Sequence, residues 1–404
     1  MRGVVGRQRH GIVAASALAG LAAALGGCGG GTTTVTVTAS ATSPAGSPLP
    51  STSPSGAATP TPPASTPTPS GPPAVFLVWA ATTAAGSVHI RVATPGGGPA
   101  RAVATLPAGA IVMAMGHGQV VAQTADHQIL TVDVRTGRQT RHPGGAGPLF
   151  GGAFDATGHR FAFVDAASPT SIRLDVLDLV ADRVTTVAPL TIQFVSPMTW
   201  VGSVLAGPVI AGFSDAPQVG ARRVDATTGA TLATATVSGA AAYSVFADGL
   251  HGAAIAHAPL GDEGDAQPGP GPQGPFNTLR TYTIGTAGST TVSSAAHHQV
   301  VVLDGTPDGG TILVSDTSAA GGFAGISMSP DFGLFLVRGT SRTQLAHVGM
   351  DRQAGVILQD GRTAVVAESL AGEVTLTQYG TSGSPVTLDA APGTQSVVGL
   401  VPAA

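Results

Sequence analysis

The chain has 404 residues, including 57 Gly and 31 Pro, with 43% hydrophobic and only 10% charged residues. Coiled coils and long helical bundles are excluded, because they need abundant Glu, Lys, Arg and Leu, and average proteins carry about 25% charge. All 18 basic residues are Arg, and the formal net charge is −4. Because no basic cluster is present, neither nucleic-acid binding nor charge-driven docking on anionic lipid is expected.

Residues 1–27 have the layout of an export signal. Arg2, Arg7 and Arg9 form a positive start, and an apolar stretch of fifteen residues follows from Gly11 to Leu25. This stretch is too short to span the ~30 Å hydrocarbon core of a bilayer, which takes about 20 helical residues. An ordinary secretory signal is one interpretation of the segment.

The apolar stretch ends in Leu25, Gly26, Gly27 and Cys28. This segment resembles the lipobox of bacterial lipoproteins, of actinobacterial type, and the absence of Lys is typical of a very GC-rich genome. The resemblance implies that Cys28 receives a diacylglyceryl group and becomes the first residue after cleavage, although Gly26 stands where Ala, Ser or Thr is commoner. Cys28 is the only Cys, so no disulfide can form within the chain, and lipidation would consume its thiol. We therefore expect an exported protein anchored at the outer face of the cytoplasmic membrane.

Residues 29–73 consist mainly of Gly, Ser, Thr, Ala and Pro and contain no charged or aromatic residue. Such a segment cannot build a hydrophobic core and is expected to be disordered. Extended at about 3.1 Å per residue, it would reach on the order of 140 Å. The predicted organisation is a signal peptide at 1–27, the lipidated Cys with a Pro/Ser/Thr-rich linker at 28–73, and one folded domain at 74–404.

A hairpin signature repeats along the predicted domain: an alternating strand, a turn with Gly or Asp, and a Thr/Val-rich strand. Its clear copies lie at Ile129–Gly137, Leu174–Asp182, Arg222–Gly229 and Arg280–Gly288, and weaker copies at Val88–Thr94, Gln344–Met350 and Thr375–Gly383. The turn Asp of the first three copies recurs in steps of 45 and 47 residues. Antiparallel β-units of constant size are therefore predicted.

A second signature is an apolar residue, a polar turn and an apolar strand. It occurs at Phe154–Val164, Val245–Ile255 and Met328–Val337, and in a short form at Thr306–Val314. These segments resemble the repeat units of TolB-like and WD40-like β-propellers, although the Trp-Asp dipeptide of WD40 blades is missing. The resemblance implies an all-β propeller with seven blades of roughly 47 residues, while six or eight blades, or a pair of β-sandwiches, remain alternatives.

The two ends of the predicted domain offer strands for closing a ring. Val75–Trp79 and Ser396–Val401 are both apolar and β-prone. Each blade has a face that it cannot cover alone, so the first and last blades must meet. We expect these two segments to complete one blade together.

No catalytic motif is present in the sequence. Gly-x-Ser-x-Gly and His-Glu-x-x-His do not occur, and one Cys cannot build a Cys-based metal site. The Gly-rich segments 96–98 and 144–145 are predicted to be turns, and His251, His257 and the pair 297–298 to be hydrogen-bonded or surface residues. Neither catalytic residues nor cofactors are predicted.

The segment 261–275 interrupts the repeat with an insertion rich in Gly and Pro. Asp262, Glu263 and Asp265 place three carboxylates there that could coordinate Ca²⁺, although the spacing is not that of an EF-hand. A solvated blade-to-blade insertion is the simpler interpretation.

The function expected from these features is a binding or scaffolding module for envelope proteins or glycans. The alternatives are an extracytoplasmic carbohydrate-active enzyme that uses the propeller channel, and a sensory or accessory subunit beside an envelope transporter. A channel lined by Ala, Val, Gly and Thr would favour the module, whereas three or more converging charged side chains would favour the enzyme. Few aromatic residues are available for sugar stacking, and both Trp79 and Trp200 are expected in the core.

Overall fold

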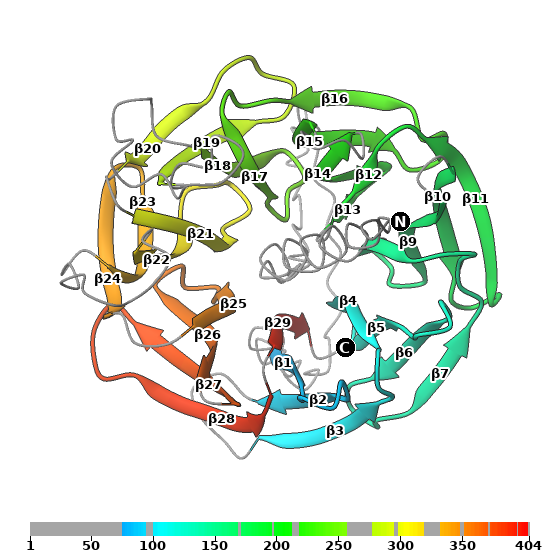
Figure 1. The fold of residues 1–404 in the computed structure, drawn as a ribbon, viewed down its shortest axis with the longest axis horizontal. Helices are drawn as coiled ribbons and strands as arrows, with labels where there is room; N and C mark the ends of the chain where they lie inside the picture. The colour runs from blue at the N-terminus through cyan, green and yellow to red at the C-terminus, as the bar shows by residue number, and fades with distance from the viewer. Residues whose placement is uncertain are drawn as a thin grey trace, which may run out of the picture.

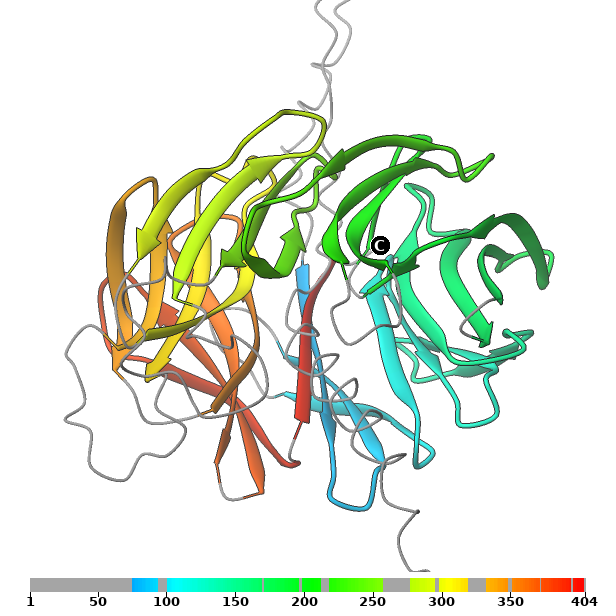
Figure 2. The ribbon, with the colours of Figure 1, turned by 45° about the horizontal axis from the view of Figure 1, so that its top comes forward.

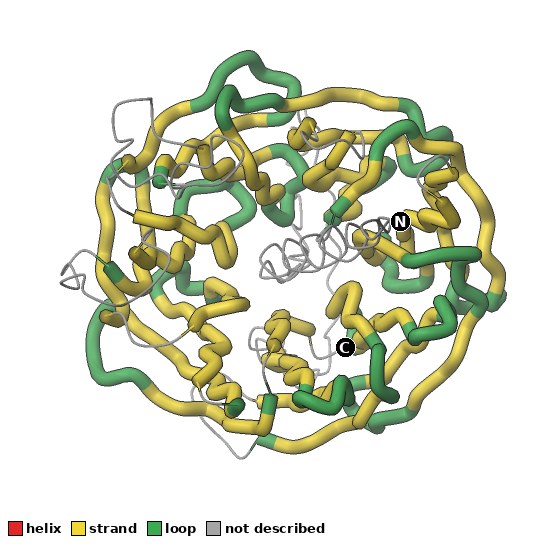
Figure 3. Tube along the Cα trace, viewed as in Figure 1, coloured by secondary structure: helices red, strands yellow, loops and turns green. Residues whose placement is uncertain are grey.

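The computed structural model describes residues 75–93, 100–168, 171–195, 198–211, 218–256, 277–294, 298–318, 332–347, 351–370, 372–393 and 395–402. These residues form strands and turns and contain no helix (Figure 3). In the part of the chain so described, no helix is long and apolar enough to cross a membrane.

The strands form seven separate antiparallel sheets that stand like blades around a central axis (Figure 1). The fold is a closed seven-bladed β-propeller. The expected all-β class and the favoured blade number are therefore confirmed, and the pair of sandwiches is excluded.

The first four blades, each given from the channel outward, are the following. Blade 1 contains β29 (Gln395–Pro402), β1 (Val75–Thr82), β2 (Val88–Ala93) and β3 (Arg101–Leu106). Blade 2 contains β4 (Ile111–Gly116), β5 (Gln119–Gln123), β6 (Ile129–Asp133) and β7 (Gln139–His142). Blade 3 contains β8 (Leu149–Phe154), β9 (Arg160–Ser168), β10 (Ser171–Asp178) and β11 (Arg183–Leu190). Blade 4 contains β12 (Gln193–Phe194), β14 (Val204–Ala211), β15 (Gln218–Asp225) and β16 (Thr231–Ala235), with β13 (Thr199–Val201) pairing to β14.

The last three blades have four strands each. Blade 5 contains β17 (Ala240–Val245), β18 (His251–Ala256), β19 (Thr278–Thr283) and β20 (Thr290–Ser294). Blade 6 contains β21 (His298–Gly305), β22 (Ile312–Ser318), β23 (Gly333–Arg338) and β24 (Ser341–His347). Blade 7 contains β25 (Asp351–Ile357), β26 (Thr363–Leu370), β27 (Glu373–Gly380) and β28 (Val386–Pro392).

The ring closes through its two ends, as the sequence predicts. The last strand, β29, pairs antiparallel with β1 over eight positions, and it is the innermost strand of blade 1 (Figure 2). A polar contact joins blade 7 to blade 1 at the same seam. The Asp389 carboxylate accepts hydrogen bonds from Trp79 Nε1 at 3.0 Å and from Arg91 Nε and Nη2 at 2.6 and 2.8 Å.

Each blade buries both of its faces against its two neighbours, which explains the nearly continuous apolar runs in its strands. On β9, Phe161 and Phe163 pack toward blade 2, whereas Ala162 and Val164 pack toward blade 4 with Trp200. Alternate residues of a strand point to opposite faces, so one run of apolar residues fills two seams. The hydrophobic core is therefore divided among the seams between blades.

The first hairpin signature forms the turn between the third and fourth strands of a blade. Asp225 accepts the N–H groups of Thr227 and Thr228 at 3.0 and 2.8 Å and the Thr228 hydroxyl at 2.9 Å. These bonds lower the pKa of the Asp225 carboxyl, the Thr228 N–H first among them. Asp133 makes the same three bonds, so the Asp spacing in the sequence measures the spacing of blades.

Two of the sequence interpretations are wrong in detail. Gln344–Met350 is not a hairpin, because its described part lies on β24, and the hairpin turn of blade 6 lies earlier, between β23 and β24. The insertion 261–275 does not join two blades, because it lies between β18 and β19 of blade 5. A connection at the end of a sheet tolerates added length at small entropic cost, so a strand pair can be kept across it.

Candidate functional site

Several residues singled out in the sequence lie outside the described residues. They are the lipobox residues Leu25, Gly26, Gly27 and Cys28, the acidic residues Asp262, Glu263 and Asp265, and the histidines His257 and His297. The two Trp side chains do lie in the core, as expected, with Trp79 fully buried and Trp200 5% exposed.

The channel wall is formed by the innermost strands, β29, β4, β8, β12, β17, β21 and β25. Among the side chains that the structure describes there, charge is limited to His298, Asp304 and Arg352, and the other positions are mainly Val, Ala, Gly, Leu and Met. His298 and Arg352 are buried within their blades. Among the described side chains of the wall, three exposed charged groups are therefore not brought together.

His298 is held by a buried carboxylate of the neighbouring strand. Its Nδ1 lies 2.9 Å from both carboxylate oxygens of Asp316, and Arg342 Nη2 lies 2.6 Å from Asp316 Oδ2. The guanidinium of Arg342 also stacks on the Phe335 ring, at 4.0 Å from its centroid. Because Asp316 is fully buried, these partners compensate the loss of its hydration.

Arg352 belongs to a similar buried cluster in blade 7. Its Nε donates to Glu368 Oε1 at 2.9 Å, and the Tyr379 hydroxyl donates to Glu368 Oε2 at 2.7 Å. Burial and the hydrogen bond to Glu368 raise the pKa of Tyr379 to about 12, so the phenol keeps its proton at neutral pH. The Glu368 oxygens are thus both occupied, as expected for a stabilising ion pair.

Asp165 and Asp175 are two carboxylates on the neighbouring strands β9 and β10 of blade 3. Both are fully buried, but Arg173 bridges them, with Nη2 at 2.6 Å from Asp165 and Nε at 3.0 Å from Asp175. Asp165 also accepts the N–H groups of Ala146 and Gly147 at 2.9 and 3.0 Å. Glycoside hydrolysis needs two carboxylates that flank a substrate, whereas these two flank a guanidinium.

Asp304, like Arg352, is a charged residue of the wall that no sequence motif indicated. Its Oδ2 accepts the Ile357 N–H at 2.7 Å, so it links the innermost strands of blades 6 and 7. Burial raises the pKa of its carboxyl to about 7, and hydrogen bonds from Ile357 and Gly305 offset only part of this effect. Asp304 therefore titrates near neutral pH and contributes a structural link between blades.

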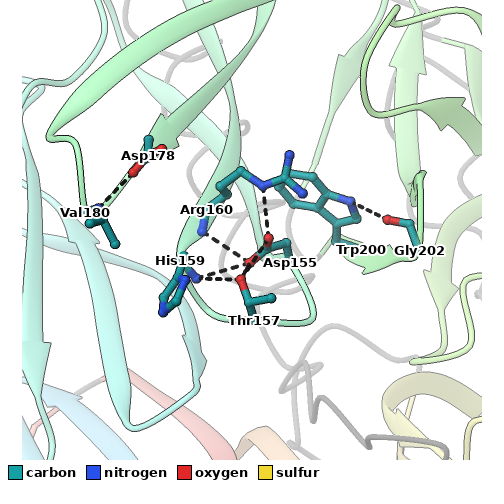
Figure 4. A network of polar contacts seen from close by, with 8 residues as sticks. All are labelled: Asp155, Thr157, His159, Arg160, Asp178, Val180, Trp200 and Gly202. Atoms are coloured by element: carbon teal, nitrogen blue, oxygen red, sulfur yellow. Dashed lines mark hydrogen bonds and ion pairs between the residues drawn. The ribbon is translucent and has the colours of Figure 1, made fainter.

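Another polar network lies at one end of the ring. The connections between the first and second strands, and between the third and fourth, meet at this end, which we call the turn end. Asp155 accepts hydrogen bonds there from His159 N at 3.1 Å, from the Thr157 hydroxyl at 3.0 Å and from Arg160 Nε at 2.9 Å (Figure 4). Burial disfavours the ionised form of Asp155, but these donors, Arg160 first, lower the pKa of its carboxyl overall.

Metal and sugar binding find little support in the described residues. Within those ranges, no group of three or more His, Cys, Asp or Glu side chains is placed to hold a metal ion. The two Trp and three Tyr of the chain, which are Trp79, Trp200, Tyr243, Tyr282 and Tyr379, are all buried. Their rings are thus unavailable as platforms for a carbohydrate.

Comparison with known proteins supports the fold and nothing finer. No family model and no curated protein matches the chain. A functionally unknown protein from Desulfotomaculum acetoxidans matches with 8% identity and a TM-score of 0.51, covering 81% of this chain and 98% of that chain. TolB from Acinetobacter baumannii matches with 12% identity and a TM-score of 0.43, covering 80% and 82%. An oligogalacturonate lyase from Vibrio parahaemolyticus matches with 11% identity and a TM-score of 0.49, covering 78% and 86%.

Identities this low establish a shared fold without a shared activity. The propeller part of the expected resemblance is confirmed by the seven sheets of the structure itself.

Proposed function

We propose that the protein is a lipid-anchored binding module that displays its propeller outside the cytoplasmic membrane to an envelope protein. The observation that carries this proposal is the channel wall, where the described charged side chains are few and mostly paired inside their blades. An enzyme that uses the channel needs reactive groups that converge there, and a module does not.

The choice of a protein partner over a glycan rests on the aromatic residues. Sugar rings are commonly bound on exposed Trp and Tyr faces, and every Trp and Tyr of this chain is buried. A protein partner needs only a specific surface, and the loops at the two ends of a propeller supply one.

The location follows from the N-terminal sequence. Cys28 and the preceding Leu25, Gly26 and Gly27 support lipid attachment, and the linker at 28–73 supports display at a distance from the membrane. Two or three acyl chains hold a protein firmly at a membrane surface, whereas one chain does so only marginally. No transmembrane segment is required for this arrangement.

The experiment is an in-cell crosslinking pull-down of the protein beside a Cys28→Ala form. Labelled palmitate should enter the wild type and not Cys28→Ala, and the wild type alone should sediment with membranes. Defined envelope proteins should be recovered with the anchored form only. Recovery of no reproducible partner would contradict the module, and equal membrane association of the two forms would contradict the anchor.

A further inference from the structure

Arg160 is fixed in place at the turn end by contacts on two sides. Its Nε donates to Asp155 Oδ2 at 2.9 Å, and its guanidinium carbon lies 5.0 Å from the centroid of the Trp200 ring. Trp200 is 5% exposed, and its Nε1 donates to the Gly202 carbonyl at 3.0 Å. Figure 4 shows the guanidinium lying over the indole, so the side chain from blade 3 is clamped on a ring from blade 4.

The two terminal nitrogens of Arg160 are left for another partner. Neither Nη1 nor Nη2 has a hydrogen-bond partner within the described ranges, and the side chain is 53% exposed. Other arginines paired to acids use these nitrogens inside the protein: Arg91 Nη2 bonds Asp389 at 2.8 Å, and Arg173 Nη2 bonds Asp165 at 2.6 Å. Arg160 is thus held in one position, while Nη1 and Nη2 can donate hydrogen bonds to another molecule.

The surroundings of Arg160 suit a protein contact. Val180 is 75% exposed in the adjacent turn, where the Leu179 N–H donates to the His159 carbonyl at 2.8 Å. The nearby acid Asp178 accepts the N–H groups of its own turn. The exposed side chain of Val180 therefore lies in the turn next to a cation whose neighbouring carboxylates are already engaged.

We infer that Arg160, with the exposed Val180 in the adjacent turn, is the point at which the partner protein docks, and that it receives a carboxylate from that partner. This inference rests on the proposed binding function and gives it a location and a chemistry. A guanidinium fork matches a carboxylate in geometry and forms two parallel charge-assisted bonds. Trp and Arg are the side chains that most often dominate binding energy, and prior immobilisation of Arg160 lowers the entropic cost of docking.

The test is site-specific photocrosslinking of the full chain in cells. Benzoylphenylalanine replaces either Val180, at the turn end, or Ile111, which is 62% exposed at the start of β4 and hence at the opposite end. Each form is combined with Arg160→Gln, Arg160→Lys or Arg141→Gln. Arg141 is the matched control, because its side chain is 58% exposed and it pairs with Asp126 at 3.2 Å.

The expected result is a crosslink from position 180 to a defined segment of one protein that contains Asp, Glu or a C-terminal carboxylate. Its yield should fall at least tenfold with Arg160→Gln and with Arg160→Lys, because Lys keeps the charge but lacks the fork. Arg141→Gln should leave it unchanged. Thermal melting should show that Arg160→Gln is folded, since Asp155 keeps the His159 and Thr157 donors.

The other outcomes overturn the inference in distinguishable ways. If the crosslink from position 180 survives Arg160→Gln, Arg160 is not part of the contact. If it is lost with Arg160→Gln but survives Arg160→Lys, the positive charge is sufficient and the two-nitrogen geometry of Arg is not needed. Crosslinks from position 111 alone move docking to the opposite end and leave the binding module standing. If neither position gives a crosslink while the pull-down still recovers envelope proteins, the docking point fails and the binding module stands. If the pull-down also recovers none, both fail.

Discussion

The turn of blade 4 that contains Gly229 offers a direct test of how the blades are held together. Gly229 has a φ of +70°, and a Cβ added there would lie 2.3 Å from the Cβ of Ala188 on β11 of blade 3. Gly239 has nearly the same φ, +72°, but a Cβ there would meet no atom within 4 Å. The substitutions Gly229→Ala and Gly239→Ala therefore share the backbone strain, and only Gly229→Ala adds a clash between blades.

The free-energy costs of the backbone strain and of the clash between blades can be estimated separately. An L-residue in the left-handed region costs about 1–2 kcal/mol, and forcing an extra methyl into a packed seam costs about 1–3 kcal/mol. Gly239→Ala should therefore destabilise the fold by about 1–2 kcal/mol, and Gly229→Ala by about 2–5 kcal/mol. The difference between the two losses in the free energy of unfolding measures how tightly the turn of blade 4 packs against β11.

Denaturant unfolding of a Cys28→Ala form supplies the measurement, because the midpoint shifts at constant slope when only stability changes. Adding Ala188→Gly to Gly229→Ala should recover most of the excess loss, since it removes the methyl that is struck. Equal destabilisation by Gly229→Ala and Gly239→Ala would refute the reasoning, as it would mean that β11 retreats without cost. A double variant no more stable than Gly229→Ala would refute the assigned contact.

Three further changes test the channel and the closure of the ring. Because the pKa of Asp304 is raised to about 7 from 3.8, the folded state favours the proton, so the wild type should lose stability as pH rises from about 4 through 7. Asp304→Asn should remove that loss, so melting at pH 5 and pH 8 should differ less than in the wild type; an unchanged difference would contradict the role of Asp304. Asp389→Ala should cost about 3–5 kcal/mol in denaturant unfolding, because it leaves Trp79 and Arg91 without their acceptor in a buried seam, and a loss below about 1 kcal/mol would count against that tie. Deleting β29 should open the ring and make β1 sensitive to limited proteolysis, and a protease-resistant product would show that closure is dispensable.

The repeat was readable from the sequence because its cause is local. Asp133 and Asp225 each bond backbone and hydroxyl groups two and three residues ahead, so the turn is encoded within one short segment. Ring closure was readable because a ring must join its first blade to its last, and both end segments, Val75–Trp79 and Ser396–Val401, are apolar and β-prone. The insertion at 261–275 was recognised but misplaced, because sequence spacing does not say which strand pair a long connection joins.

The contacts between blades were not readable in the same way. Arg160 and Trp200 belong to different blades, and the link from Asp304 to Ile357 spans 53 residues. Such pairs depend on how one sheet is rotated and shifted against the next, which no local pattern specifies. The sequence did contain one local signal, the turn signature in which Arg160 follows the Asp155 turn directly. That signature gave no reason to connect Arg160 with a tryptophan in the next blade.

The closed ring restricts where this protein can bind a partner. Both faces of each blade are buried in seams, and the described channel wall is mainly apolar. At the turn end, carboxylates such as Asp133 and Asp225 are bonded to their own turns, which lowers the pKa of each and leaves them charged but engaged. Arg160 differs from them in being a cation that Asp155 and Trp200 hold in place, while its two terminal nitrogens have no hydrogen-bond partner within the described ranges. Although the chain carries a formal net charge of −4, the partner chemistry that this end selects is therefore anionic.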